Sequence, residues 1–130
     1  VNGVSAEVRN VVAAVTDGVV EFNRQPSFWA SSIVDLPGST KVMLPACSLQ
    51  GLLEEADPDV LVVDTEGAEG RLFDGLRLPE RLRHAVVEVH KPLIGLAAIS
   101  ACFDAMSKAS LGYDPDGSSH TNVTFSRTDR

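Results

Sequence analysis

A short apolar run at residues 60–63, Val-Leu-Val-Val, constrains the fold of this chain more than any other feature. A run this short and this rich in β-branched residues predicts a strand buried on both faces, as in the parallel sheet of an α/β domain. The run stops at Asp64, and Glu66, Gly67 and Glu69 follow at once. We therefore expect these residues at the carboxyl end of the strand, the edge where open α/β sheets bind ligands.

A second strand-like run, residues 85–90, ends in a similar way with Glu88 and His90 two positions apart. Side chains two apart on a strand point to the same face, so both are expected at the same rim of the sheet. There, His90 could act as a general base toward an alcohol, and Glu88 could hold its tautomer or share a cation. The alternative is a Glu88 paired with a nearby arginine and a His90 that faces solvent at a strand end.

The acidic residues after the first run also have two explanations. Asp64 and Glu66 could bind a divalent cation or orient a substrate hydroxyl. Alternatively, Glu66 and Glu69 begin a helix, whose dipole favours negative charge by about 0.3–1 kcal/mol each. We favour the helix explanation for Glu69 and a functional role for Asp64, because a carboxylate that ends a buried strand needs a partner. Gly67 suits a tight turn or a ligand that lies close to the backbone.

The motif Asp64-Thr65-Glu66-Gly67-Ala68-Glu69, followed by Leu72, Gly75 and the ending at residues 87–90, resembles the core of FkbM-type methyltransferases. In that family an apolar strand ends in Asp-x-Glu-Gly-x-Glu, a short helix follows, and the next strand closes on Glu-x-His or similar. The resemblance implies an S-adenosylmethionine cofactor and methyl transfer to a hydroxyl of a small molecule or sugar. The residues that we assign to catalysis are Asp64, Glu66, Glu88 and His90.

The resemblance extends upstream, where residues 13–17 look like the third strand of the family. It implies that the cofactor contacts come from Ala14, Val15, Asp17, Asp64 and Gly67. Family members begin with a strand and a glycine-rich turn that hold the methionine part of the cofactor, yet this sequence has no Gly-x-Gly pair. The chain is therefore expected to be the C-terminal part of a methyltransferase domain.

Composition and charge argue against several kinds of partner. The net charge of −7 and the scattered arginines disfavour nucleic acid and anionic lipid surfaces. No apolar stretch reaches the length of a membrane span, and no signal peptide is recognisable, so a cytoplasmic protein is expected. Cys47 and Cys102 are not part of a Cys-x-x-Cys motif and are expected to be free.

The order of predicted elements indicates one α/β domain over residues 1–130. Predicted strands cover residues 8–15, 41–44, 60–63, 85–90 and 121–126, with an antiparallel excursion between 18 and 34. One predicted helix follows the N-cap Ser48, and two more cover residues 66–75 and 96–111. Residues 92–95 are predicted to form a loop, and residues 114–117 are predicted to form a turn. The expected fold is the C-terminal half of a Rossmann-like methyltransferase sheet, with mostly parallel strands flanked by helices and an antiparallel final pair. Its first strand would leave an apolar edge exposed, which predicts self-association.

Three functions remain open at this point. The leading hypothesis is part of a methyltransferase that acts on oxygen and takes a small-molecule hydroxyl as substrate. The second is a non-catalytic α/β module, because the glycine-rich cofactor motif is missing. The third is a divalent-metal hydrolase built on Asp64, Glu66, Glu88 and His90, which would need a further ligand or a bound water.

Overall fold

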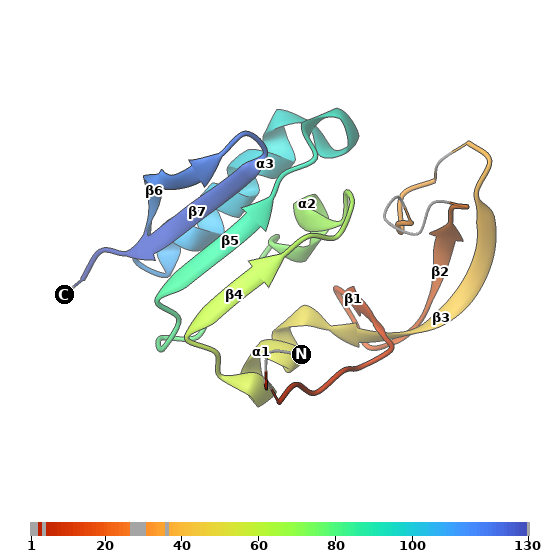
Figure 1. Cartoon of the computed structure of the whole chain (residues 1–130), viewed down its shortest axis with the longest axis horizontal. Helices are drawn as coiled ribbons and strands as arrows, with labels where there is room; N and C mark the ends of the chain where they lie inside the picture. Colours follow the sequence, from red (N-terminus) through yellow and green to blue (C-terminus); the bar gives the residue numbers. More distant parts are fainter. Residues whose placement is uncertain (1–2, 4, 27–30, 36, 130) are drawn as a thin grey trace.

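The chain forms two separate β-sheets in a computed structural model that describes residues 3, 5–26, 31–35 and 37–129 (Figure 1). The first sheet has the order β1-β3-β2 and contains β1 (Val12–Ala14), β2 (Gly18–Arg24) and β3 (Thr40–Ser48). The second sheet has the order β4-β5-β7-β6 and contains β4 (Val60–Val63), β5 (His84–Glu88), β6 (Leu111–Ser119) and β7 (Asn122–Arg127). The helices are α1 (Leu49–Ala56), α2 (Glu69–Leu72) and α3 (Lys91–Lys108).

The N-cap of α1 and the kink in α3 both come from individual residues. The Ser48 hydroxyl accepts a hydrogen bond from the Gly51 N–H at 3.1 Å, so the predicted N-cap of α1 is confirmed. Helix α3 starts five residues earlier than the sequence predicts and is kinked at Gly95, whose φ is 73°. The predicted loop at residues 92–95 is thus the first turn of this helix. Within the described part of the chain, no helix is long and apolar enough to cross a membrane.

The hydrophobic core lies between the helices and one face of the second sheet. Ala85 and Val87 of β5 are fully buried on this face, whereas His84, Val86 and Glu88 alternate with them on the opposite face. Ala85 and Val87 belong to one core cluster with side chains of the three helices, which include Leu49, Leu53, Leu72, Cys102 and Met106. The second sheet is therefore covered by helices on one face, and its other face is open.

The predicted Rossmann-like fold is wrong. The pairs β1–β3 and β4–β5 are parallel, but β2–β3, β5–β7 and β6–β7 are antiparallel, and the strands belong to two sheets rather than one. Two expected pairings are present, the parallel pairing of β4 with β5 and the antiparallel pairing of the last two strands. Val60 and Val62 are 54% and 71% exposed, so β4 is not buried on both faces. A strand with one open face is usually marked by alternating polar and apolar residues. Because all four residues of this run are apolar, the sequence pattern does not indicate the open face of β4.

Two predicted elements are shorter in the structure. The strand expected at residues 8–15 is reduced to β1, and the helix expected at residues 66–75 is reduced to α2. The helix begins late because Glu66 and Gly67 have left-handed backbone, with φ of 51° and 105°. A residue in that conformation turns the chain and cannot lie in a right-handed helix.

The excursion after residue 18 and the turn at residues 114–117 also differ from prediction. Strand β2 returns as β3, and among the described residues near the predicted return, only an isolated bridge joins Asn23 to Ser32. Residues 27–30, including Phe28 and Trp29, lie outside the described residues. The Asp114-Pro115-Asp116-Gly117 segment lies within β6, where its register against β7 shifts between residues 114 and 119. The sequence marks the irregularity correctly but not the strand that contains it.

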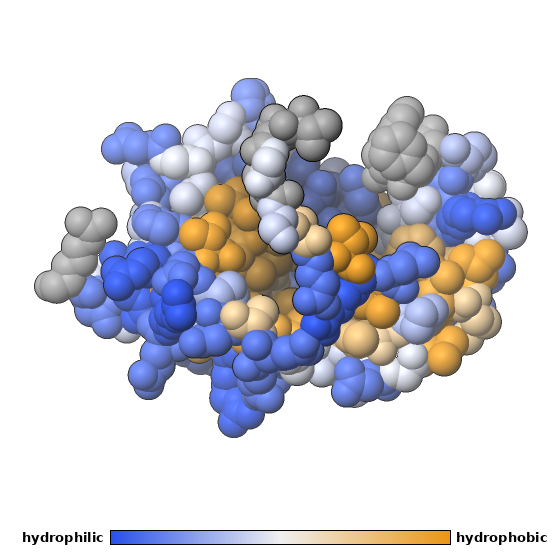
Figure 2. All heavy atoms as spheres, turned by 60° about the horizontal axis from the view of Figure 1, so that its bottom comes forward, coloured by the Kyte–Doolittle hydropathy of each residue, from blue (hydrophilic) through white to orange (hydrophobic). Residues whose placement is uncertain are grey.

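Apolar side chains remain exposed on both sheets. Figure 2 shows two hydrophobic areas on one face of the molecule, one over the region of β4 and one over the region of β2 and β3. Val60 and Val62 are exposed on β4, and Val19 and Met43 are exposed on β2 and β3. Because β1 and β4 are end strands of their sheets, each has an edge without a partner strand among the described residues.

The two cysteines provide a test of this packing. Both are free, and Cys47 on β3 is half-buried, whereas Cys102 on α3 is fully buried. Burial, with a smaller effect of the Glu69 charge, raises the pKa of the Cys102 thiol to about 12. Since the thiolate is the reactive form, we expect a thiol-specific disulfide reagent to modify Cys47 in the folded protein and Cys102 only after unfolding.

In native buffer, the wild-type protein should therefore react with the reagent at one thiol, and in denaturant it should react at two. The Cys47→Ala variant should not react with the reagent until it unfolds. Rapid modification of Cys102 in native buffer would contradict the packing of α3 against the second sheet.

Candidate functional site

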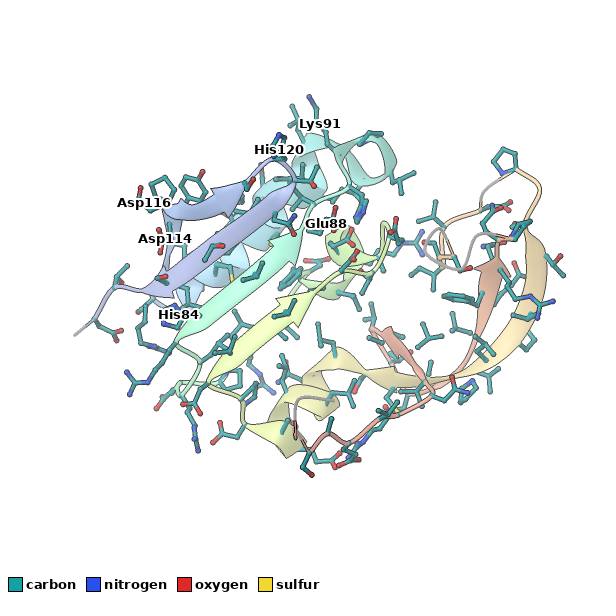
Figure 3. All side chains as sticks on the ribbon, in the orientation of Figure 1. His84, Glu88, Lys91, Asp114, Asp116 and His120 are labelled. Carbon is teal, nitrogen blue, oxygen red and sulfur yellow. The ribbon has the colours of Figure 1, made fainter. Side chains whose placement is uncertain are left out.

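The candidate site lies where β4 and β5 end. The two strands are parallel neighbours, with Val63 opposite Val87, so the residues that follow them leave the sheet at the same edge. Asp64 and Glu66 follow β4, Glu88 is the last residue of β5, and His90 comes two residues later. Figure 3 shows Glu88 at this end of β5 and His84 at the opposite end of the strand. All four residues assigned to catalysis thus come from one edge of the second sheet.

The imidazole of His90 is the centre of the site, and its side chain is 16% exposed. Its Nε2 atom lies 3.3 Å from Glu66 Oε2, 3.9 Å from Glu88 Oε1 and 4.0 Å from Asp64 Oδ1. Its Nδ1 atom lies 3.3 Å from Glu69 Oε1. One imidazole therefore lies close to four carboxylates. We name these five residues the rim cluster: Asp64, Glu66, Glu69, Glu88 and His90.

Glu69 is the member of the rim cluster that sequence reasoning missed. Its side chain is 0% exposed. Its Oε1 accepts hydrogen bonds from the N–H of Thr65 at 3.0 Å and from the Thr65 hydroxyl at 2.9 Å. Both oxygens also accept from the N–H of Gly67, at 3.2 and 3.1 Å. Because the helix dipole favours a glutamate at a helix start whether it is exposed or buried, the sequence carries no separate signal for this buried role.

The contact with Glu69 determines what the His90 ring can offer. Because an ionised carboxylate only accepts hydrogen bonds, we assign the ring proton of His90 to Nδ1, as the donor to Glu69. In the neutral ring, Nε2 then presents a lone pair, and the oxygens around it belong to carboxylates as well. At this position the site can take up a proton or bind a cation.

A pocket of about 560 Å³ opens beside the rim cluster, between the two sheets. Asp64, Thr65, Glu66 and Ala68 line one side of it. The other side is largely apolar and comes from the first sheet and its connections, with Val11, Val12, Ala13, Phe22, Ile33 and Leu44. A mostly apolar lining with a few polar groups, at this size, is typical of small-molecule sites.

The first sheet is tied directly to the turn that carries Glu66. The buried Ser32 donates a hydrogen bond from its hydroxyl to the carbonyl oxygen of Glu66 at 2.6 Å. Ser32 in turn is bonded to Asn23 of β2 through both backbone groups, at 2.7 and 3.1 Å. Gly67 lies so close to this segment that a Cβ atom there would be 2.9 Å from Val34 Cγ2. The turn of the site is therefore held from both sheets.

The residues expected to contact the cofactor are less concentrated. Asp64 lines the pocket, but Gly67 is buried and packed against Val34 and Leu93. Ala14 and Val15 line a different depression, beside the end of α2. Asp17 is exposed, and its Oδ1 accepts a hydrogen bond from the Ser48 N–H at 2.8 Å. The structure thus brings the predicted catalytic residues together and leaves most of the predicted cofactor residues outside this pocket.

A second polar chain lies away from the rim, on the open face of the second sheet (Figure 3). His84 Nδ1 is 3.1 Å from the Ser126 hydroxyl, which donates to Asp114 Oδ2 at 2.8 Å. The bond from Ser126, with backbone N–H bonds from Gly117 and Asp116, holds the pKa of Asp114 below its usual range. Because the serine proton points to the aspartate and not to the histidine, this chain lacks the order of a nucleophilic triad. It joins the strands β5, β6 and β7.

No family model, curated protein or solved structure matches this chain. The candidate site is therefore interpreted from its own geometry and from the residues of the motif that it contains.

The buried position of Glu69 gives a stability prediction. In Glu69→Ala, the N–H groups of Thr65 and Gly67 lose their acceptor inside the protein, and we expect the free energy of unfolding to fall by about 3 kcal/mol. Glu69→Gln keeps one acceptor oxygen and should lose less. Urea denaturation followed by circular dichroism measures both. As a control, Glu80→Ala removes an exposed carboxylate and should stay within about 0.5 kcal/mol of wild type. Equal stability of Glu69→Ala and Glu80→Ala would show that the Glu69 contacts contribute little.

Proposed function

We propose that the rim cluster and its pocket are part of an active site for methyl transfer from S-adenosylmethionine to a hydroxyl of a small molecule or sugar. The observation that carries the proposal is the position of His90 Nε2, which lies 3.3 to 4.0 Å from carboxylate oxygens of Glu66, Glu88 and Asp64 beside the pocket. The resemblance of residues 64–69 and 87–90 to FkbM-type methyltransferases supports the same reaction.

The pocket suits the cofactor in size and chemistry. Its apolar wall can take an adenine-like ring, and the carboxylates of Asp64 and Glu66 can accept hydrogen bonds from ribose hydroxyls or balance a sulfonium charge. When bound, S-adenosylmethionine supplies the methyl group. The contacts proposed for Ala14, Val15, Asp17 and Gly67 need a ligand that extends beyond this pocket.

The rim cluster has two tasks in this proposal. It holds the acceptor hydroxyl in line with the methyl group, a placement that can contribute much of the rate enhancement. It also takes up the hydroxyl proton, because each of its side chains offers an acceptor atom. Glu69 has a positioning role, since it fixes the orientation of the His90 ring from a buried site.

Calorimetry with S-adenosylmethionine tests the proposal against a non-catalytic module. Saturable binding by the folded chain supports the proposal. If the folded chain shows no heat of binding, an α/β module without cofactor is the better description of this polypeptide.

Two substitutions at the rim should separate catalysis from cofactor binding. We expect Asp64→Asn and His90→Ala each to slow transfer of a labelled methyl group to hydroxyl acceptors by at least about a hundredfold, the lower end for positioned acid/base groups. The affinity for S-adenosylmethionine should fall more in Asp64→Asn than in His90→Ala, because Asp64 lines the pocket and His90 does not. Glu80→Gln, which changes an exposed carboxylate, is the control. Near-normal turnover in both folded rim variants would make the rim cluster structural.

We further propose that the chain associates with itself through an exposed sheet edge. Val62 is 71% exposed on β4, an end strand, and unpaired edges favour pairing with another chain. Analytical ultracentrifugation should show association that increases with concentration and weakens in Val62→Lys, because a lysine on an edge strand opposes pairing. Met43→Lys places the same charge at an exposed apolar position of β3, the central strand of the first sheet, and is the matched control. A monomer at tens of micromolar would contradict the proposal.

The cytoplasm remains the proposed location. Both cysteines are free, and Cys47 is partly accessible in the folded chain. Disulfides form and persist in oxidising compartments, so a protein that keeps its thiols reduced suits a reducing one.

A further inference from the structure

We propose that Asp64, Glu66 and His90 form a binding site for a divalent transition-metal ion. One ligand atom from each residue lies within 4.8 Å of the other two. An ion at about 2.1 Å from its ligands keeps neighbouring ligands roughly 3 Å apart. The distance of 3.3 Å from His90 Nε2 to Glu66 Oε2 matches this value, and Asp64 Oδ1, at 4.0 Å from Nε2, needs only a small side-chain movement to join them.

The charges around the site call for a cation. Asp64, Glu66 and Glu88 direct oxygens toward Nε2, and Glu69 contacts the other ring nitrogen. In the described part of the chain, no lysine or arginine forms an ion pair with any of these four carboxylates, although pairs of that kind occur elsewhere, as between Lys41 and Glu21. Like charges this close repel one another, and a bound cation would remove that repulsion.

The histidine is already held in the way that metal ligands are held. Ligating histidines usually donate their second ring N–H to a carboxylate or carbonyl, which fixes the tautomer and makes the free nitrogen a better ligand. Here Nδ1 of His90 meets the buried Glu69, which leaves Nε2 free toward Asp64 and Glu66. Glu69 is thus an outer carboxylate that orients the ligand without binding the ion.

The ligand set indicates the kind of ion. Imidazole nitrogen suits zinc and other first-row transition metals, and carboxylate oxygens suit manganese and magnesium. One nitrogen with two carboxylates therefore favours Mn²⁺ or Zn²⁺ over Mg²⁺. Because Asp64 and Glu66 also line the pocket, the remaining coordination positions face a space large enough for a small molecule. If the proposed function holds, a hydroxyl oxygen of the acceptor can occupy one of them.

Metal titration of the whole chain tests this site. The protein is treated with EDTA, exchanged into metal-free buffer and titrated with Mn²⁺, Zn²⁺ and Mg²⁺ in a calorimeter, with no other ligand present. We expect one saturable site for Mn²⁺ or Zn²⁺ and weaker binding of Mg²⁺. Asp64→Asn, Glu66→Gln and His90→Gln should each weaken binding at least tenfold, and Glu69→Gln should weaken it 10- to 100-fold as an outer-shell change.

The control is Asp116→Asn, which neutralises an exposed carboxylate on β6 and should leave the affinity unchanged. Circular dichroism confirms that each variant is folded before titration. No saturable binding by the folded wild type, or equal binding in the three ligand variants, would overturn the metal site. The proposed methyl transfer is tested separately, by calorimetry with S-adenosylmethionine. If the protein binds the cofactor but no metal ion, only the metal site is overturned. If it binds a metal ion but not the cofactor, only the proposed methyl transfer is overturned.

Discussion

The geometry of the candidate site depends on one buried carboxylate. Glu69 is fully enclosed, and its oxygens are bonded to the backbone and hydroxyl of Thr65, to the N–H of Gly67 and to the ring of His90. Burial of a carboxylate is costly unless such donors are present, so these bonds must persist for the fold to be stable. Because Thr65 follows β4 and His90 follows β5, the same side chain fixes the turn after one strand and the imidazole after the next.

The meeting of the rim residues could be predicted from the sequence. Two apolar runs of similar length, each followed or closed by charged residues, predict neighbouring parallel strands, and the register of Val63 opposite Val87 brings their ends together. The role of Glu69 could not be assigned in the same way. A glutamate at a helix start is favoured by the helix dipole whether it is exposed or buried, so the local pattern fits both cases equally. Only the packing of α2 under the rim makes it a buried acceptor.

The fold class was beyond the reach of the same patterns. Parallel pairing of β4 and β5 was expected, but the run at residues 60–63 has no polar position to show that one face of β4 is open. The Asp-Pro-Asp-Gly segment predicts a turn from composition, yet Asp114 accepts the N–H groups of Asp116 and Gly117 inside a continuing strand. In both places the local signal is correct, and the tertiary context decides what it becomes.

The first sheet is a necessary part of the site, although the rim residues all belong to the second. The Ser32 hydroxyl bonds to the Glu66 carbonyl, and Gly67 admits Val34 at a distance that a larger residue would block. Glu66 itself has left-handed backbone, a conformation that costs energy in residues other than glycine and persists only where its surroundings enforce it. The bond from Ser32, which is anchored on β2 through Asn23, supplies part of that enforcement. The carboxylate of Glu66 therefore reaches His90 because two sheets, and not one, hold the turn between β4 and α2.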